Sequence, residues 1–447
     1  MLYRLLWYPY YHKAEPYSSP NCILHEVYSF ILMAPCDVNM FLSARIRAMP
    51  LTPSDFGRML GAMNTKLFKE LCEATGAPGF EYEIREIIIR EMEPIADEVS
   101  IDNIGNVTCL IRGKSSGKKI VCAAHMDEIG FIVRHIDDQG FIRILPLGGF
   151  DPKTLTAQRV VVHGRKDLPG CMGVKPIHVM TPDERTKMPA VTDFVVDLGM
   201  PKDEVEKYVS VGDSITRIGD LIEMGDCLNV KSIDNRGGCY MLIEAVRAIR
   251  AAGQKPDFDL YAVFSVQEEV GLRGAQAATL KLQPDFAFAL DTTIAFDTPG
   301  SGAHDKCTVL GKGAAVKVYD GTLITDARMV QYMTALCAEK KIPYQLELLA
   351  AGGTDAGALQ KYTAGGSVTG AVSIPVRNVH QSIEMAHKVD VQACVDLLAA
   401  CLTSLSRWDW SWKRTERKLA PAPKAVAKKP AAKKSPVKKP VAKKGRK

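Results

Sequence analysis

Long apolar runs and paired cysteines are both missing from this sequence. No stretch approaches the run of about 18 apolar residues that a membrane-spanning helix requires, so the sequence predicts no membrane span. The twelve cysteines are scattered, without a Cys-x-x-Cys pair or a paired spacing typical of a zinc ribbon. Scattered cysteines in a long chain are usually buried small hydrophobic residues in a reducing compartment. We therefore expect a cytoplasmic protein without a catalytic cysteine.

Acidic residues are missing from residues 419–447, which hold eleven Lys or Arg. The net charge of +6 therefore reflects this segment, since residues 1–418 have a net charge of −5. Repeats such as Lys428-Lys429-Pro430 cannot bury apolar area, so residues 411–447 are predicted to form a disordered basic tail. Two interpretations of the tail stay open: non-specific binding to nucleic-acid phosphates, and solvation without a dedicated partner.

A regular hydrophobic period is missing from residues 1–62. The basic start, apolar core and small-residue cleavage site of a secretory signal do not occur there in that order. We expect residues 1–62 to be an extension outside the fold, with Met63 as the natural start. An organelle transit peptide is the alternative, because the segment has arginines and few acids.

From Met63 onward, hydrophobic periodicity predicts an α/β fold. Helical spacing covers residues 64–74 and 82–92, and β-type runs follow at 107–111 and 119–124. After a change of rhythm, the predicted elements are helices at residues 235–251, 325–339 and 391–405, and strands at 260–266, 286–290, 344–349 and 367–374. Such alternation predicts a sheet flanked by helices.

The change of rhythm falls at residues 131–226. Short apolar runs alternate there with Gly, Pro and Asp every eight to twelve residues, which predicts a compact all-β module. The α/β domain is therefore expected to comprise residues 63–130 and 227–410, with the β module inserted between the two segments.

Five short segments end an apolar strand with acids or histidines. They are AHMDE at residues 124–128, SIDNRGG at 232–238, FSVQEEVG at 264–271, FAFALD at 286–291 and PVRNVH at 375–380. Taken singly, each has a structural alternative: a buried structural histidine at His125, a helix N-cap at Asp234, and a solvated turn at Glu268 and Glu269. In an α/β sheet, however, ligands bind beyond the carboxyl ends of the strands, where these segments are expected to meet.

Taken together, the segments supply two histidines and three carboxylates as candidate ligands, and no cysteine: His125, Asp234, Glu269, Asp291 and His380. That inventory suits two divalent ions, namely zinc, cobalt or manganese. Glu268 is then surplus to the ligand count. Asp127 is spaced to accept the second ring N–H of His125 and so to orient that ring.

These segments, in this order, resemble the tetrahedral-aminopeptidase family, which holds glutamyl and related aminopeptidases of the zinc-peptidase clan. The likeness runs from about Met63 to Leu405 and includes IDNIGN at 101–106, GGF at 148–150, GVKP at 173–176, GTDAG at 353–357 and RNVH at 377–380. The resemblance implies a zinc-peptidase-like mixed sheet with an inserted, small, β-barrel-like dimerisation domain. It also implies a homo-oligomer, since the family commonly forms twelve-subunit tetrahedral shells.

The resemblance also implies a role for each site residue. His125 and Asp291 would hold one metal ion, Glu269 and His380 the other, and Asp234 would bridge the two. Glu268 would be the general base, with Asp127 supporting the site. The sequence departs from the family at Asn235, where Asp is frequent, and at Gln381, where Ser is common.

The expected activity is removal of N-terminal residues from peptides. A metal ion lowers the pKa of bound water to about 7, and a carboxylate such as Glu268 would carry its proton to the leaving nitrogen. Deacylation of N-acyl amino acids is the second enzymatic interpretation, because relatives in the clan share this metal site. A nucleic-acid-associated protein, through the basic tail, is the interpretation from another class. The motifs do not reveal the preferred N-terminal residue.

Overall fold

The computed structural model describes residues 63–413. The extension expected at residues 1–62 and nearly all of the basic tail expected at 411–447 lie outside these residues, so both stay predictions, as does phosphate binding by the tail. Within residues 63–413, no helix combines the length and apolar character needed to cross a membrane. The ten cysteines described there are free thiols, and seven of them are buried.

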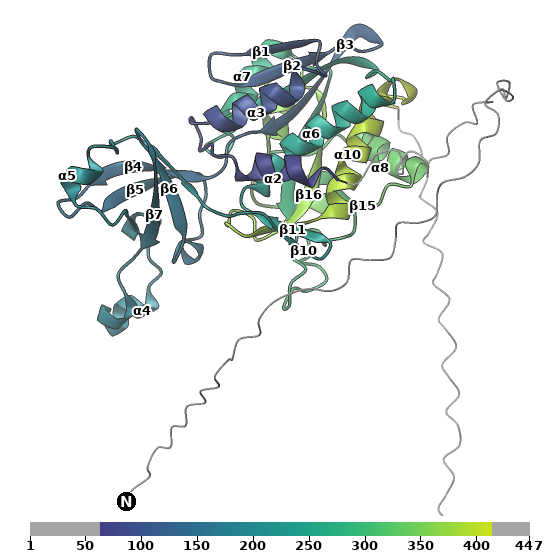
Figure 1. Ribbon diagram of the computed structural model, residues 1–447. Coiled ribbons are helices and arrows are strands. Elements are labelled where there is room, and N and C mark those ends of the chain that lie inside the picture. Colours follow the sequence, from purple (N-terminus) through teal and green to yellow (C-terminus); the bar gives the residue numbers. More distant parts are fainter. Residues whose placement is uncertain (1–62, 414–447) are drawn as a thin grey trace, which may run out of the picture. The chain divides into compact units, whose positions relative to one another are not determined.

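Four parallel strands form the centre of the large sheet, part of which is seen among the helices in Figure 1. Their order is β12 (Phe258–Ser265), β3 (Ser115–His125), β13 (Phe286–Ile294) and β16 (Val368–Arg377). Each is buried along most of its length, as expected for parallel strands covered on both faces. Because they run in one direction, their carboxyl ends meet at the same edge of the sheet.

The remaining seven strands make this an 11-stranded mixed sheet. On the β12 side they are β2 (Val107–Ile111) and β1 (Glu98–Ile101). On the β16 side they are β17 (Glu384–His387), β11 (Cys227–Val230) and β10 (Ile222–Met224). The last two form a branch, in which β14 (Ala314–Tyr319) pairs with both β16 and β15 (Tyr344–Leu348).

Helices cover both faces of the sheet. The face with the larger core packs against α2 (Thr65–Glu73), α3 (Tyr82–Met92), α6 (Ile233–Ala251), α8 (Ala327–Lys340) and α10 (Lys388–Leu402). The other face packs against α7 (Arg273–Leu282) and α9 (Asp355–Lys361). The alternation along β3 explains this division, because Ile120 and Cys122 enter the first core while Val121 and Ala123 enter the second.

The predicted all-β module is a closed six-stranded barrel with its own core. Its strands are β4 (Gly130–Ile136), β5 (Ile142–Leu147), β8 (Val195–Asp197), β7 (Asp167–Gly173), β6 (Arg159–His163) and β9 (Ser214–Arg217), in the order around the barrel. Two short helices, α4 (Pro182–Thr186) and α5 (Lys202–Val205), lie in its loops. The predicted fold class, an α/β sheet with an inserted β barrel, is confirmed.

Replacing a side chain of the central strand tests the importance of the parallel core. Phe288 in β13 is fully buried, so Phe288→Ala should lower the free energy of unfolding by about 3–5 kcal/mol. Leu280→Ala is the matched control, because Leu280 in α7 is 61% exposed and its loss should cost no more than about 0.5 kcal/mol. Chemical denaturation of both variants measures the difference, and equal losses would contradict this account of the core.

Candidate metal centre

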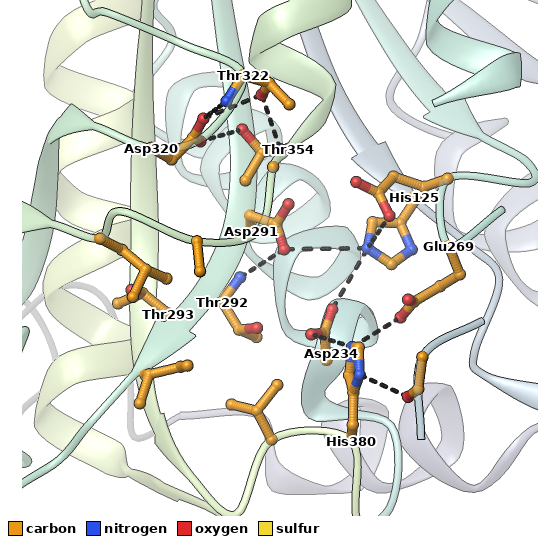
Figure 2. A pocket seen from close by; sticks show the side chains of 18 of the residues that line it. His125, Asp234, Glu269, Asp291, Thr292, Thr293, Asp320, Thr322, Thr354 and His380 are labelled. Carbon is orange, nitrogen blue, oxygen red and sulfur yellow. Dashed lines mark hydrogen bonds and ion pairs between the residues drawn. The ribbon is translucent and has the colours of Figure 1, made fainter. Parts of the chain in front are cut away.

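Three of the predicted site residues meet where β3 and β13 face the start of α6 (Figure 2). Nε2 of His125, the last residue of β3, lies 3.3 Å from Oδ1 of Asp234 and 3.9 Å from Oδ1 of Asp291. The sequence predicted that Asp291 ends its strand, but it does not. Because residues 291–294 continue the pairing with β16, strand β13 runs on to Ile294.

A second group of three shares Asp234 with the first. Nε2 of His380 lies 3.5 Å from Oδ2 of Asp234 and 3.3 Å from Oε1 of Glu269. In each group, the candidate ligand atoms lie within 4.8 Å of one another. The structure therefore brings together all five predicted ligands, and Asp234 turns one carboxylate oxygen towards each histidine (Figure 2).

Asp234 is not the N-cap that the sequence alone permitted. Its carboxylate faces the two histidines and accepts no backbone N–H of the first turn of α6, as a capping side chain would. Asn235 takes the capping role instead, since its Oδ1 accepts a hydrogen bond from the backbone N–H of Gly238 (3.0 Å). Nδ2 of Asn235 also donates to the carbonyl oxygen of Leu290 (2.7 Å). An ionised Asp, frequent here in the family, has no hydrogen to donate to that carbonyl.

The ring of His125 is oriented by the backbone rather than by the expected carboxylate. Nδ1 of His125 lies 3.1 Å from the carbonyl oxygen of Asp127 and 3.6 Å from its Oδ1. The Asp127 carboxylate accepts the backbone N–H groups of Glu268 (3.0 Å) and Glu269 (3.1 Å). An N–H on Nδ1 leaves the lone pair of Nε2 facing the carboxylates, the arrangement that a metal-binding histidine needs.

His380 is held from both domains. Its Nδ1 lies 2.9 Å from the carbonyl oxygen of Gly149, which follows β5 of the barrel. Arg217, the last residue of β9, donates through Nη1 to the carbonyl oxygen of His380 (2.8 Å). The buried carboxylate of Glu384 accepts the backbone N–H groups of His380 (2.8 Å) and Asp234 (2.9 Å). This carboxylate thereby links the two segments that meet at the centre.

The carboxylates of the centre are crowded and buried. Burial raises the pKa of Glu268 well above its usual value, and the neighbouring carboxylate of Glu269 raises it further. Burial, with the charge of Asp234, also raises the pKa of Asp291. Such a concentration of buried acids is unfavourable unless a cation compensates it. Oxygen and imidazole ligands in two groups of three therefore fit divalent metal ions.

A buried ion pair supports the centre from behind. Nζ of Lys231 donates to Oε1 of Glu128 (2.8 Å), and Oγ of Ser232 donates to Oε2 (2.6 Å). Glu128 follows His125 by three positions in the chain, and Ser232 precedes Asp234 by two. The pair therefore joins the two ligand-bearing segments.

Sequence reasoning missed the supporting residues Glu128, Lys231, Arg217 and Glu384. One signal was available for Glu384, because it shares the inward face of its short strand with Ala386, where an acid is unusual. The other three residues belong to common residue types, and no spacing links them to the ligands.

The centre opens into a pocket of about 530 Å³. All five candidate ligands and Glu268 line it, together with residues from β13, from β14 and the loop after it, and from the segment 349–354. Gln381, the second departure from the family pattern, is not one of the lining residues in the described part of the chain. The volume is typical of a site for a small ligand or a peptide end.

Sequence relatives share this architecture. The M42 glutamyl aminopeptidase family matches residues 105–397. A putative aminopeptidase of Acetivibrio thermocellus is 39% identical over 75% of this chain and 97% of its own length. A lysyl aminopeptidase of Pyrococcus furiosus is 33% identical over 77% of this chain and 99% of its own length. A glutamyl aminopeptidase of Lactococcus lactis is 31% identical over 76% of this chain and 95% of its own length.

Solved structures agree. A TET aminopeptidase from a marine-sediment Thaumarchaeota archaeon superposes with a TM-score of 0.74 at 35% identity, covering 76% of this chain and 96% of its own. The TET1 peptidase of Pyrococcus horikoshii has a TM-score of 0.68 at 29% identity, covering 76% of this chain and 98% of its own. That peptidase is described as able to assemble into a tetrahedron or a large octahedral shell. The chain belongs to the M42 family of aminopeptidases.

Proposed function

We propose that this aminopeptidase works with two divalent metal ions. The observation that carries the proposal is the pair of ligand groups that share Asp234, one with His125 and Asp291 and the other with Glu269 and His380. Asp234 would bridge the ions, and zinc or cobalt would suit these ligands best, with manganese as a further candidate. When bound, the ions would polarise the scissile carbonyl and lower the pKa of water.

Glu268 is the proposed general base. It lies at the pocket, and its Oε2 is 3.8 Å from Nε2 of His125. Glu268 could also join His125 and Glu269 as a ligand group, but the two groups that share Asp234 are complete without it. A carboxylate at this position could accept a proton from the attacking water and deliver it to the leaving nitrogen. Asp127 holds the backbone of Glu268 in place and supports the reaction without touching the substrate.

The substrates proposed are peptides with a free N-terminus. N-acyl amino acid deacylation stays the alternative on the same site. Relatives named for lysyl and for glutamyl activity match this chain almost equally well, so resemblance alone does not decide the preferred residue.

A homo-oligomer is also proposed, with a dodecamer as its expected form. The loop between β7 and β8 of the barrel exposes Ile177, Val179 and Met188, each more than half accessible. Exposed apolar side chains concentrated in one loop are typical of a contact surface. The shells described for the TET1 peptidase support the same assignment. A cytoplasmic location stays a prediction from the cysteine pattern.

Glu268→Gln tests the general base. The variant keeps the shape of the side chain and should retain both metal ions, while kcat falls about 10²- to 10⁴-fold. Elemental analysis and kcat are measured on the same preparation, with Glu83→Gln on the exposed face of α3 as the control. Wild-type turnover by Glu268→Gln would remove Glu268 from the role of base.

Removal of one ligand tests the number of metal ions. Wild-type protein, dialysed free of excess metal, should hold two ions per chain, and His380→Ala should hold one, because the His125 group stays complete. His304→Ala is the control, since His304 lies far out in solvent with a side chain that is 90% exposed. A stoichiometry of one in the wild type, measured by elemental analysis, would contradict the dinuclear site.

Blocking the amino terminus separates the two enzymatic candidates. An aminopeptidase requires the free amine, so N-acetylated peptides should not be cleaved while the same unblocked peptides are. Chromatographic detection of the released residue makes the comparison. Efficient hydrolysis of N-acetyl amino acids would favour the deacylase.

A further inference from the structure

The pocket extends from the metal centre to a cluster of three charged side chains, Lys317, Asp320 and Glu347. Lys317 and Asp320 line the pocket, and Glu347 lies behind them. Lys317 is the one lysine or arginine among the lining residues of the described chain. It is therefore the one fixed cation there that an acidic substrate side chain could meet.

The charge of Lys317 is already used within the protein. Its Nζ forms an ion pair with Glu347 and lies 3.5 Å from Oδ2 of Asp320. Its side chain is only 2% exposed. Burial opposes ionisation of Lys317, but the two carboxylates raise its pKa above the usual value and keep the ammonium charged. With one cation and two anions, the cluster has a net charge of −1.

Neutral hydrogen-bond donors hold the side chain of Asp320. Its Oδ1 accepts the backbone N–H of Thr322 (2.7 Å) and of Leu323 (2.8 Å), and also the hydroxyl of Thr322 (2.9 Å). Its Oδ2 accepts the hydroxyl of Thr354 (3.1 Å), as Figure 2 shows. These bonds tie Asp320 to the protein, so it does not move away to release Lys317.

Apart from the candidate ligands, Glu268 and this cluster, the side chains that line the pocket are uncharged. They are hydroxyl or aliphatic groups, such as Thr292, Thr293, Ile294, Leu349 and Val379. An acidic side chain entering this space would lose its hydration and lie close to a cluster with more acidic than basic groups. The one lysine there is already paired with acids, and the proposed metal ions are engaged by their own carboxylate ligands. Each of these effects raises its energy. A neutral side chain avoids them, and a basic one is attracted by the surplus carboxylate.

We propose that this cluster makes the enzyme reject acidic N-terminal residues and accept neutral and basic ones. The proposal rests on the function proposed above, because it concerns the side chain of the residue to be removed. It assigns Asp320 and Glu347 as residues that determine specificity through charge, and Lys317 as a cation that they neutralise.

Matched leucyl, lysyl and glutamyl p-nitroanilides test the ranking on the full chain reconstituted with cobalt or zinc. The kcat/KM for the glutamyl substrate should be at least about tenfold below that for both of the others. A glutamyl value equal to or above the leucyl value would overturn the proposal. Failure to cleave any of the three would instead overturn the proposed aminopeptidase function, so the two failures are distinguishable.

Two charge-neutralising variants test the cause. Asp320→Asn and Glu347→Gln each remove one negative charge and should raise the ratio of glutamyl to leucyl kcat/KM about three- to tenfold. Asp138→Asn, in the fully exposed barrel loop, is the control that should leave this ratio unchanged. The ratio cancels differences in the active fraction between preparations. If both cluster variants keep the wild-type ratio, the charge cluster is not the determinant; if either fails to fold, the other and the wild-type ranking still decide.

Discussion

The concentration of negative charge at one edge of the parallel strands is the constraint on which the structure depends. Asp234 lies between two histidines, with Asp291 and Glu269 on its two sides. Carboxylates so close and so deeply buried repel one another, so backbone N–H groups and buried partners must hold the surrounding segments in place. Asp127 and Glu384 perform this task by each accepting two backbone N–H groups.

Much of the fold was predictable because its strongest elements have long, regular hydrophobic patterns. The helix predicted at residues 82–92 corresponds to α3, and the strand predicted at 107–111 to β2. Helices α7 and α9 were missed, because their buried residues are mostly small and their apolar stripes are short. Helix α10 begins and ends three residues earlier than predicted, since Lys388 and Asp390 are included in its first turn although neither fits an apolar period.

The candidate ligands were predictable for a different reason. Each directly follows, or lies near the end of, an apolar run, and parallel strands bring such positions to one edge. Their supporting contacts were not predictable, because they join residues far apart in the sequence through common groups. The contact between Nδ1 of His380 and the carbonyl oxygen of Gly149 is one example. The hydrogen bond from the side-chain amide of Asn235 to the carbonyl oxygen of Leu290 is another. Lys317 gave a weak signal, as the one cation in the apolar run of β14.

The barrel interrupts the chain between His125 and every other candidate ligand. During synthesis, the first histidine therefore leaves the ribosome well before the acids that complete its group, and His380 emerges last. At about 5–20 residues per second, the interval from His125 to His380 is roughly 10–50 s. Neither ligand group exists on the early nascent chain, so metal loading belongs to a late stage of biogenesis. A chain stalled within the barrel would hold one of the five candidate ligands, too few to make a metal site.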